Sequence, residues 1–210
     1  MLLSKFVEAL DTSTISQARQ GALAPLVSYI EEQLALRRAQ GGLQKQSIRL
    51  NFICTHNSRR SHLCQVWAQT LGHYYGVPDL SCYSGGTEAT ALFPRVAQTL
   101  RETGFHVSVL AESTNPIYAI KYDALEPPVI GFSKVYDSDF NPRADFAAVM
   151  TCAQADADCP LVPGAAKRIS LPYEDPKRYD ESPMQAQAYA DRSLQIATEM
   201  KFVFGRVGVS

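Results

Sequence analysis

The stretch that decides the fold runs from Ile48 to Ser61 and reads IRLNFICTHNSRRS. Apolar Ile48, Leu50 and Phe52 alternate with polar residues, which is the pattern of a strand. A polar segment at 55–60 follows, and a helical pattern then runs from Ser61 to about residue 72. A strand, a polar loop and a helix in this order form the opening unit of a parallel α/β sheet.

The pattern on the C-terminal side extends this sheet. It predicts strands at 80–84, 145–151 and 169–171, and helices at 94–103 and 184–204. We therefore expect an α/β fold, a three-layer sandwich with a central four-stranded parallel sheet in flavodoxin-like order and helices on both faces. Residues 111–143 hold four prolines among short apolar pieces, which predicts an insertion in the form of a hairpin or a lid.

The N-terminal part has a different pattern. Residues 1–46 are expected to form a helical N-terminal extension of a main domain at 47–210. Pro25 suits the first position of a helix, Ile30 and Leu34 follow at helical spacing, and Gly41 and Gly42 end it. This favours a helical hairpin packed on the main domain, with a partner-binding arm as the alternative.

Composition narrows the classes of protein. The 210 residues carry 20 Lys and Arg against 21 Asp and Glu, so the net charge is −1 and does not favour binding nucleic acid through bulk positive charge. No run of apolar residues is long enough to span a membrane. The first residues do not resemble a secretory signal, so the expected location is the cytoplasm. The five cysteines are expected to be reduced there.

The loop after the first strand carries the chemistry. Cys54 is followed by five residues, then by Arg60 and Ser61. Backbone N–H groups of a tight loop at a helix N-terminus cradle a tetrahedral oxyanion, and the same field favours a nucleophilic thiolate at Cys54. Arg60 can hold two oxygens of the anion, and Ser61 can donate a hydrogen bond to the sulfur. A buried cysteine that merely ends a strand is the alternative. The expected oxyanion-binding residues are Thr55, His56, Asn57, Ser58, Arg59, Arg60 and Ser61.

Two further cysteines point to the same edge of the sheet. Cys152 ends a predicted strand, and Cys159 follows seven residues later. Because the carboxyl ends of parallel strands meet at one edge, Cys54 and Cys152 are expected on the same rim. Core packing and a metal site are the alternatives, but no paired histidine or further cysteine stands at ligand spacing, so no metal is expected. Cys64 and Cys82 are expected to pack in the core.

The Cys-Thr-His-Asn-Ser-x-Arg-Ser loop resembles the phosphate-binding loop of the low-molecular-weight protein tyrosine phosphatase superfamily, in particular its thioredoxin-coupled arsenate reductases. Residues 83–88 resemble the second strand and the turn after it. Residues 173–176, Tyr-Glu-Asp-Pro, resemble the late loop that supplies the general acid, here Asp175. The spacing of Cys152 and Cys159 matches the redox segment of the reductases. The chain departs from the family at His56, where glycine is common, and at Arg59, where several relatives have a second cysteine.

The resemblance implies a function and a set of partners. It implies an arsenate reductase in which Cys54, Arg60 and Asp175 act on the anion and Cys152 and Cys159 relay a disulfide. A protein tyrosine phosphatase with a phosphocysteine intermediate is the alternative, and a non-catalytic anion sensor is a third. The implied ligand is arsenate, phosphate or sulfate. No tightly bound cofactor is expected, and the implied reductant is an external dithiol such as thioredoxin.

Overall fold

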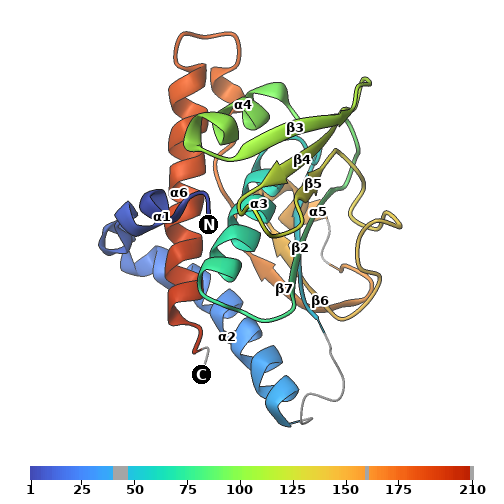
Figure 1. Cartoon of the computed structure of the whole chain (residues 1–210). Helices are drawn as coiled ribbons and strands as arrows, with labels where there is room; N and C mark the ends of the chain where they lie inside the picture. The colour runs from blue at the N-terminus through green and yellow to red at the C-terminus, as the bar shows by residue number, and fades with distance from the viewer. Residues whose placement is uncertain (40–46, 159–160, 209–210) are drawn as a thin grey trace.

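Four parallel strands form the centre of the molecule (Figure 1). The structure, a computed structural model, describes residues 1–39, 47–158 and 161–208. The strands are β1 (Ile48–Cys54), β2 (Leu80–Gly86), β6 (Phe146–Met150) and β7 (Ala165–Ser170), and their spatial order is β2-β1-β6-β7. Counted along the chain, this is the order 2-1-3-4. The predicted parallel sheet and its flavodoxin-like order are therefore confirmed.

The register of the sheet brings the carboxyl ends of the strands together. Cys54, the last residue of β1, lies opposite Gly86, the last residue of β2. On the other side of β1, Ile53 lies opposite Met150 at the end of β6. The segments that leave β1, β2 and β6 therefore start from one edge of the sheet, which is where ligands bind in open α/β folds.

The two faces of the sheet are covered unequally. Ile48, Leu50 and Phe52 point into a large apolar core, whereas Ile53 belongs to a smaller one on the opposite face. The large core also receives side chains from three long helices: α2 (Gln17–Ala39), α3 (Arg60–Tyr74) and α6 (Gln185–Arg206). The small core receives Ala155 from the short helix α5 (Ala153–Asp158). Helix α4 (Pro94–Thr103) packs against α6.

The N-terminal extension packs into the large core instead of projecting from it. It consists of α1 (Ser4–Ala9), a short 3-10 helix η1 (Thr12–Thr14) and α2. The expected helix start at Pro25 is wrong, because α2 begins at Gln17 and Pro25 lies inside it. The buried Leu23 explains this, since its contact with the core holds the helix together on the N-terminal side of the proline. The expected stop at 41–42 and the domain boundary at 46 lie outside the described residues.

A second, smaller sheet follows α4. It is antiparallel, in the order β3-β4-β5, with β3 (His106–Ala111), β4 (Ile117–Lys121) and β5 (Val129–Gly131). This sheet starts before residue 111, where the insertion was expected to begin. The chain then returns to the end of β2, where Gly86 N donates to Lys134 O at 2.9 Å and Tyr136 N donates to Gly86 O at 2.9 Å. Part of the expected insertion is thus attached to the central sheet beside the Cys54 loop.

The last strand also differs from the expected one. It was expected at 169–171, but β7 starts at Ala165. The sequence signal is weak because β7 is an edge strand whose Lys167 and Arg168 form ion pairs with Glu32 and Asp156 instead of packing in a core. In the described parts of the chain, every helix is too short or too polar to cross a lipid bilayer.

Candidate active site

The loop from Cys54 to Arg60 connects β1 directly to α3, as expected. Its left-handed residue is Asn57, with φ of 44°, and not His56, which stands where the family commonly has glycine. Asparagine tolerates this conformation better than most residues with a side chain. The left-handed turn of the loop therefore lies at Asn57, one residue after the position where glycine is common in the family.

The neighbouring strand holds the loop from the inside. Thr87 N donates to Cys54 O at 3.1 Å, and Glu88 N donates to Thr55 O at 2.8 Å. A Cβ atom on Gly86 would lie 2.6 Å from Thr55 O and 2.7 Å from Asn57 N. Only glycine allows the two backbones to approach this closely.

The Cys54 sulfur has a hydrogen-bond donor of its own. Ser61 Oγ lies 3.1 Å from Cys54 Sγ. Ser61 Oγ accepts a hydrogen bond from Asn57 Nδ2 at 2.9 Å, and its own proton is available to the sulfur. Asn57 therefore holds the Ser61 hydroxyl in contact with the sulfur. Asn57 thus acts behind the anion cradle and does not line it.

His62 fixes the backbone of the same turn. Its Nε2 lies 2.8 Å from Asn57 O, and its Nδ1 lies 3.2 Å from Ser84 Oγ. A carbonyl only accepts, so Nε2 carries the proton and Nδ1 accepts from Ser84. His62 is fully buried, and burial, together with the nearby Lys134 charge, lowers its pKa to about 3.

This buried histidine predicts a steep loss of stability in acid. The folded state keeps His62 neutral down to about pH 3, whereas the unfolded chain protonates it near pH 6.5. The unfolded state therefore binds more protons in this window, and stability falls as the pH falls through it. Between pH 6.5 and 4.5 the free energy of unfolding should fall by on the order of 2 kcal/mol less in a variant without His62 than in the wild type.

The measurement is urea unfolding of the wild type and of His62→Gln at pH 6.5 and 4.5. His106→Gln is the control, because His106 is exposed. Equal pH dependence in the wild type and His62→Gln would contradict the assignment.

Arg60 reaches from the start of α3 to the loop that carries Asp175. Its Nη1 donates to Tyr173 O at 3.0 Å, and its Nη2 lies 2.6 Å from Asp175 Oδ2. The Nε atom is buried and has no hydrogen-bond partner in the structure. Asp175 caps the short helix η2 (Pro176–Tyr179) through a hydrogen bond from Lys177 N to its Oδ1 at 3.0 Å. The predicted anion-binding arginine and the predicted general acid thus form an ion pair.

Arg59 is engaged elsewhere. Its Nη2 lies 2.6 Å from Asp180 Oδ2, its Nε donates to Tyr189 Oη at 2.5 Å, and its guanidinium lies 4.1 Å from the centre of the Phe93 ring. Arg59 was expected among the oxyanion-binding residues, but its charge is paired with Asp180.

A cavity of about 470 Å³ lies above the loop and is lined by most of the predicted site residues. Asn57 and Ser61 do not line it, because they lie behind the loop. Three lining residues were missed by the sequence reasoning: Thr90, Gln154 and Lys177. Gln154 and Lys177 lie two residues after Cys152 and Asp175, which is the signal that could have identified them. The lining consists of Cys54, Thr55, His56, Ser58, Arg59, Arg60, Thr90, Gln154, Asp175 and Lys177.

A second thiol lies beside the loop. Cys152 follows β6 and is 2% exposed, and its sulfur lies 3.5 Å from Thr55 Oγ1. It also accepts a hydrogen bond from Ala155 N at 3.3 Å. Cys54 and Cys152 belong to the same small apolar core. Cys159, the third cysteine of the predicted relay, lies outside the described residues.

The other cysteines are unsuited to redox chemistry. Cys64 and Cys82 are 0% and 7% exposed, and burial raises the pKa of both thiols well above the usual range. Because the thiolate is the reactive form, both thiols are poor nucleophiles. Within residues 1–39, 47–158 and 161–208, no group of three or more His, Cys, Asp or Glu side chains is arranged to hold a metal ion.

No family model matches the chain. Its sequence is 29% identical to an arsenate reductase of Bacillus subtilis (strain 168) over 142 residues, which cover 67% of this chain and 83% of that protein. It is 27% identical over 126 residues to arsenate reductase 2 of Staphylococcus epidermidis, covering 60% of this chain and 76% of that one. A low-molecular-weight phosphotyrosine phosphatase of Vibrio cholerae O395 has a TM-score of 0.51 and 14% identity, covering 75% of this chain and 94% of the other.

The protein therefore has the fold of the low-molecular-weight protein tyrosine phosphatase superfamily. Its sequence is similar to that of arsenate reductases, the branch that the Cys54 loop predicts.

Proposed function

We propose that the protein is an arsenate reductase that uses Cys54 as the nucleophile and Cys152 and Cys159 as a thiol-disulfide relay. The observation that carries this proposal is the place of Cys152, a reduced thiol in contact with Thr55 of the anion loop. A phosphatase has no use for a second thiol at this position. The similarity to arsenate reductases over 83% of the Bacillus subtilis protein supports the same activity.

The first step uses the anion loop. Arsenate enters the cradle and replaces Asp175 on the Arg60 guanidinium, and the Cys54 thiolate then attacks arsenic. An As–O bond breaks as the S–As bond forms, and Asp175 gives its proton to the departing oxygen, which leaves as water. Ser61 holds the thiolate in place before the attack.

The second step is the reduction. The Cys152 thiolate attacks Cys54 Sγ, and the electrons of the S–As bond stay on arsenic, which leaves as arsenite. Arsenic gains two electrons, and the two thiols lose them as the Cys54–Cys152 disulfide forms. Cys159 then attacks Cys152 Sγ and frees Cys54, and an external dithiol reduces the Cys152–Cys159 disulfide by exchange.

The partners and the location follow from this chemistry. We infer a thioredoxin-like protein as the reductant and no tightly bound cofactor, since the electrons pass entirely through thiols. We place the protein in the cytoplasm, where cysteines stay reduced between turnovers.

A phosphatase activity is the second candidate, because Cys54, Arg60 and Asp175 alone suffice for a phosphocysteine mechanism. The loop after Asp175 speaks against phosphotyrosine as the substrate. Lys177 and Arg178 follow Pro176, and the next residue, Tyr179, is covered by the Arg178 guanidinium at 4.8 Å from its ring centre. Tyr179 does not line the cavity above Cys54, so it is not placed to stack on a substrate ring there.

The test is a pair of assays on the wild-type protein. The first couples arsenate reduction to thioredoxin, thioredoxin reductase and NADPH, and the second measures p-nitrophenyl phosphate hydrolysis. Arsenate-dependent NADPH oxidation with arsenite as the product supports the reductase. Phosphate hydrolysis alone would assign the phosphatase, and activity in neither assay would favour the anion sensor.

Arg60→Lys should lose most of the activity. An ammonium group cannot hold two oxygens of the anion in the planar geometry of a guanidinium. The steady-state rate with arsenate is compared with that of Arg178→Lys, whose side chain is 60% exposed and does not line the cavity. Turnover near that of the wild type in Arg60→Lys would count against the anion site.

A further inference from the structure

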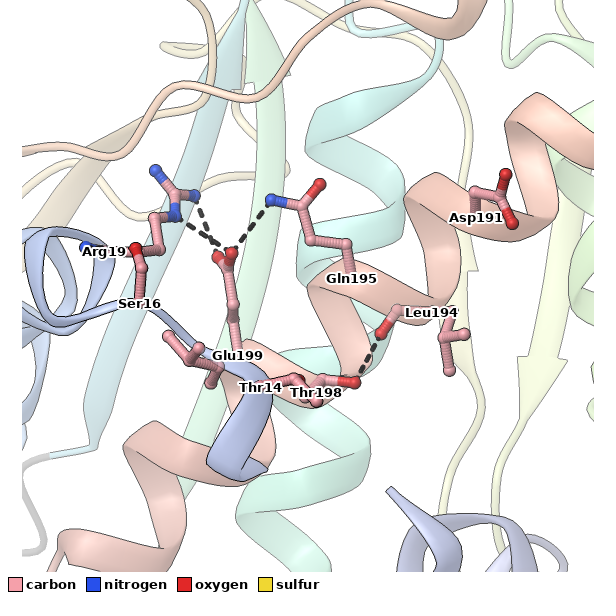
Figure 2. Close-up of a pocket in the computed structure, with 9 residues that line it drawn as sticks. Thr14, Ser16, Arg19, Asp191, Leu194, Gln195, Thr198 and Glu199 are labelled. Carbon is pink, nitrogen blue, oxygen red and sulfur yellow. Dashed lines mark hydrogen bonds and ion pairs between the residues drawn. The ribbon is translucent and has the colours of Figure 1, made fainter. Parts of the chain in front are cut away.

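Arg19, in the N-terminal extension, donates hydrogen bonds from all three nitrogens of its guanidinium. Nε donates to Glu199 Oε1 at 2.9 Å and Nη2 to Glu199 Oε2 at 2.8 Å, while Nη1 donates to Pro172 O at 3.1 Å. The guanidinium also lies 4.6 Å from the centre of the Tyr173 ring. Figure 2 shows Arg19 and Gln195 meeting at the Glu199 carboxylate. The Glu199 side chain is only 3% exposed to solvent.

The segment that Arg19 contacts is the one that carries the general acid. Residues 172 and 173 leave the sheet edge, where Tyr173 N donates to Thr151 O at 3.1 Å, and Asp175 follows two residues later. On the side of the active site, Arg60 binds Tyr173 O and Asp175. The stretch from Pro172 to Asp175 is therefore held between two arginines, one from the active site and one from the extension.

We propose that Arg19 is a positioning residue of the active site, which sets the place of Asp175 through Pro172 and Tyr173. The extension thereby becomes part of the support of the catalytic loop. This inference rests on the proposed function, in which Asp175 is the proton donor. It predicts that the geometry of Arg19 matters for the rate even though the residue does not line the catalytic cavity.

An arginine is needed here for its shape. Two nitrogens bind the two oxygens of Glu199, the third binds the Pro172 carbonyl, and the flat face covers the Tyr173 ring. A lysine at this position can neutralise Glu199, but its single ammonium cannot make these contacts together. Arg19→Lys thus keeps the charge pair with Glu199 and removes the contacts with Pro172 and Tyr173. The cavity of about 570 Å³ beside Arg19 gives a replaced side chain room without repacking the core.

The experiment is a double-mutant cycle between Arg19→Lys and Asp175→Asn, read as the rate of the first turnover. Since small misplacement of a catalytic group lowers the rate steeply, Arg19→Lys should slow the wild-type reaction roughly 10-fold. If Arg19 acts through Asp175, the same change should have no effect in the Asp175→Asn background. KM should stay within about twofold, because the anion cradle is untouched.

Lys201→Met is the matched control. Lys201 ties the same extension to the same helix by donating to Val7 O, Glu8 O and Leu10 O at 2.8, 3.0 and 2.8 Å. It makes no described contact with residues 172–175, so its loss should lower the melting temperature and leave the rate unchanged. Arg19→Met/Glu199→Met is the second test variant, since it removes the pair without leaving a buried charge, and it should reproduce the Arg19→Lys rate.

The outcomes separate this inference from the proposed function. A wild type that does not reduce arsenate would refute the proposed function, and full activity of Asp175→Asn would remove the role of Asp175 on which this inference rests. An active wild type with an Asp175-dependent rate that Arg19→Lys leaves unchanged would overturn the inference alone. An equal loss in both backgrounds would also overturn it, because the effect would not pass through Asp175.

Discussion

Replacing Cys152 by serine is expected to abolish arsenite release while p-nitrophenyl phosphate hydrolysis, where the wild type shows it, is retained. Cys152→Ser removes the thiol that the described part of the chain places beside Thr55 of the anion loop, so the S–As bond should not be broken by reduction. The phosphate reaction needs only Cys54, Arg60 and Asp175. Arsenite is measured after one equivalent of arsenate, together with the intact mass of the protein.

Cys159→Ser is the comparison within the same segment. Cys54 and Cys152 suffice for one turnover, so this variant should release one equivalent of arsenite and then accumulate the Cys54–Cys152 disulfide. On a continuous helix two thiols seven residues apart would be ~10 Å from each other, beyond the reach of a disulfide, so the relay also requires α5 to open. Normal cycling of both variants with thioredoxin would refute the relay and leave the phosphatase as the better assignment.

Asp175→Asn should lower turnover by roughly 10²- to 10⁴-fold, the usual contribution of a positioned proton donor. The amide keeps the shape of the carboxylate, and its one oxygen can still accept the hydrogen bond from Lys177 N that caps η2. The hydrogen bond to Arg60 is lost, but Arg60 still donates to Tyr173 O, so the loop should stay in place. The affinity for the anion should change much less than the rate. Both are obtained from single-turnover rates across a range of arsenate concentrations.

Glu174→Gln is the control for that variant. Glu174 precedes Asp175 in the chain, its side chain is 68% exposed, and it does not line the cavity above Cys54. Its substitution should leave the rate within twofold of the wild type, as for most exposed residues. A similar loss in both variants, or an unchanged rate in Asp175→Asn with arsenate and with an aryl phosphate, would remove Asp175 from the mechanism.

The sequence was informative where the pattern was local. The alternation before Cys54 and the helix after Ser61 gave the first strand, the loop and the helix, and the parallel sheet that they predicted is confirmed. The meeting of Cys54 and Cys152 at one edge required only the rule that parallel strands end on the same side.

Contacts over long sequence separations were beyond that reasoning. Arg59 is paired with Asp180 and Tyr189, which lie 121 and 130 residues further along the chain. The start of α2 depended on the burial of Leu23, and β7 was hidden by charged residues whose ion pairs stabilise an edge strand. In each case a tertiary partner, and not the local sequence, decided the outcome.

The close approach of Gly86 to the Cys54 loop has a consequence for changing what this protein accepts. On its inner side the loop is held tightly, because a Cβ atom on Gly86 would collide with its backbone. Asn57 accepts a hydrogen bond from Lys134 N, and His62 contacts Asn57 O. Changes there would decide whether the loop forms at all. The rim is different, because His56, Gln154 and Lys177 are exposed and line the cavity. Directed evolution toward a different anion or a bulkier ester should therefore accumulate substitutions at the rim and leave the floor of the pocket alone.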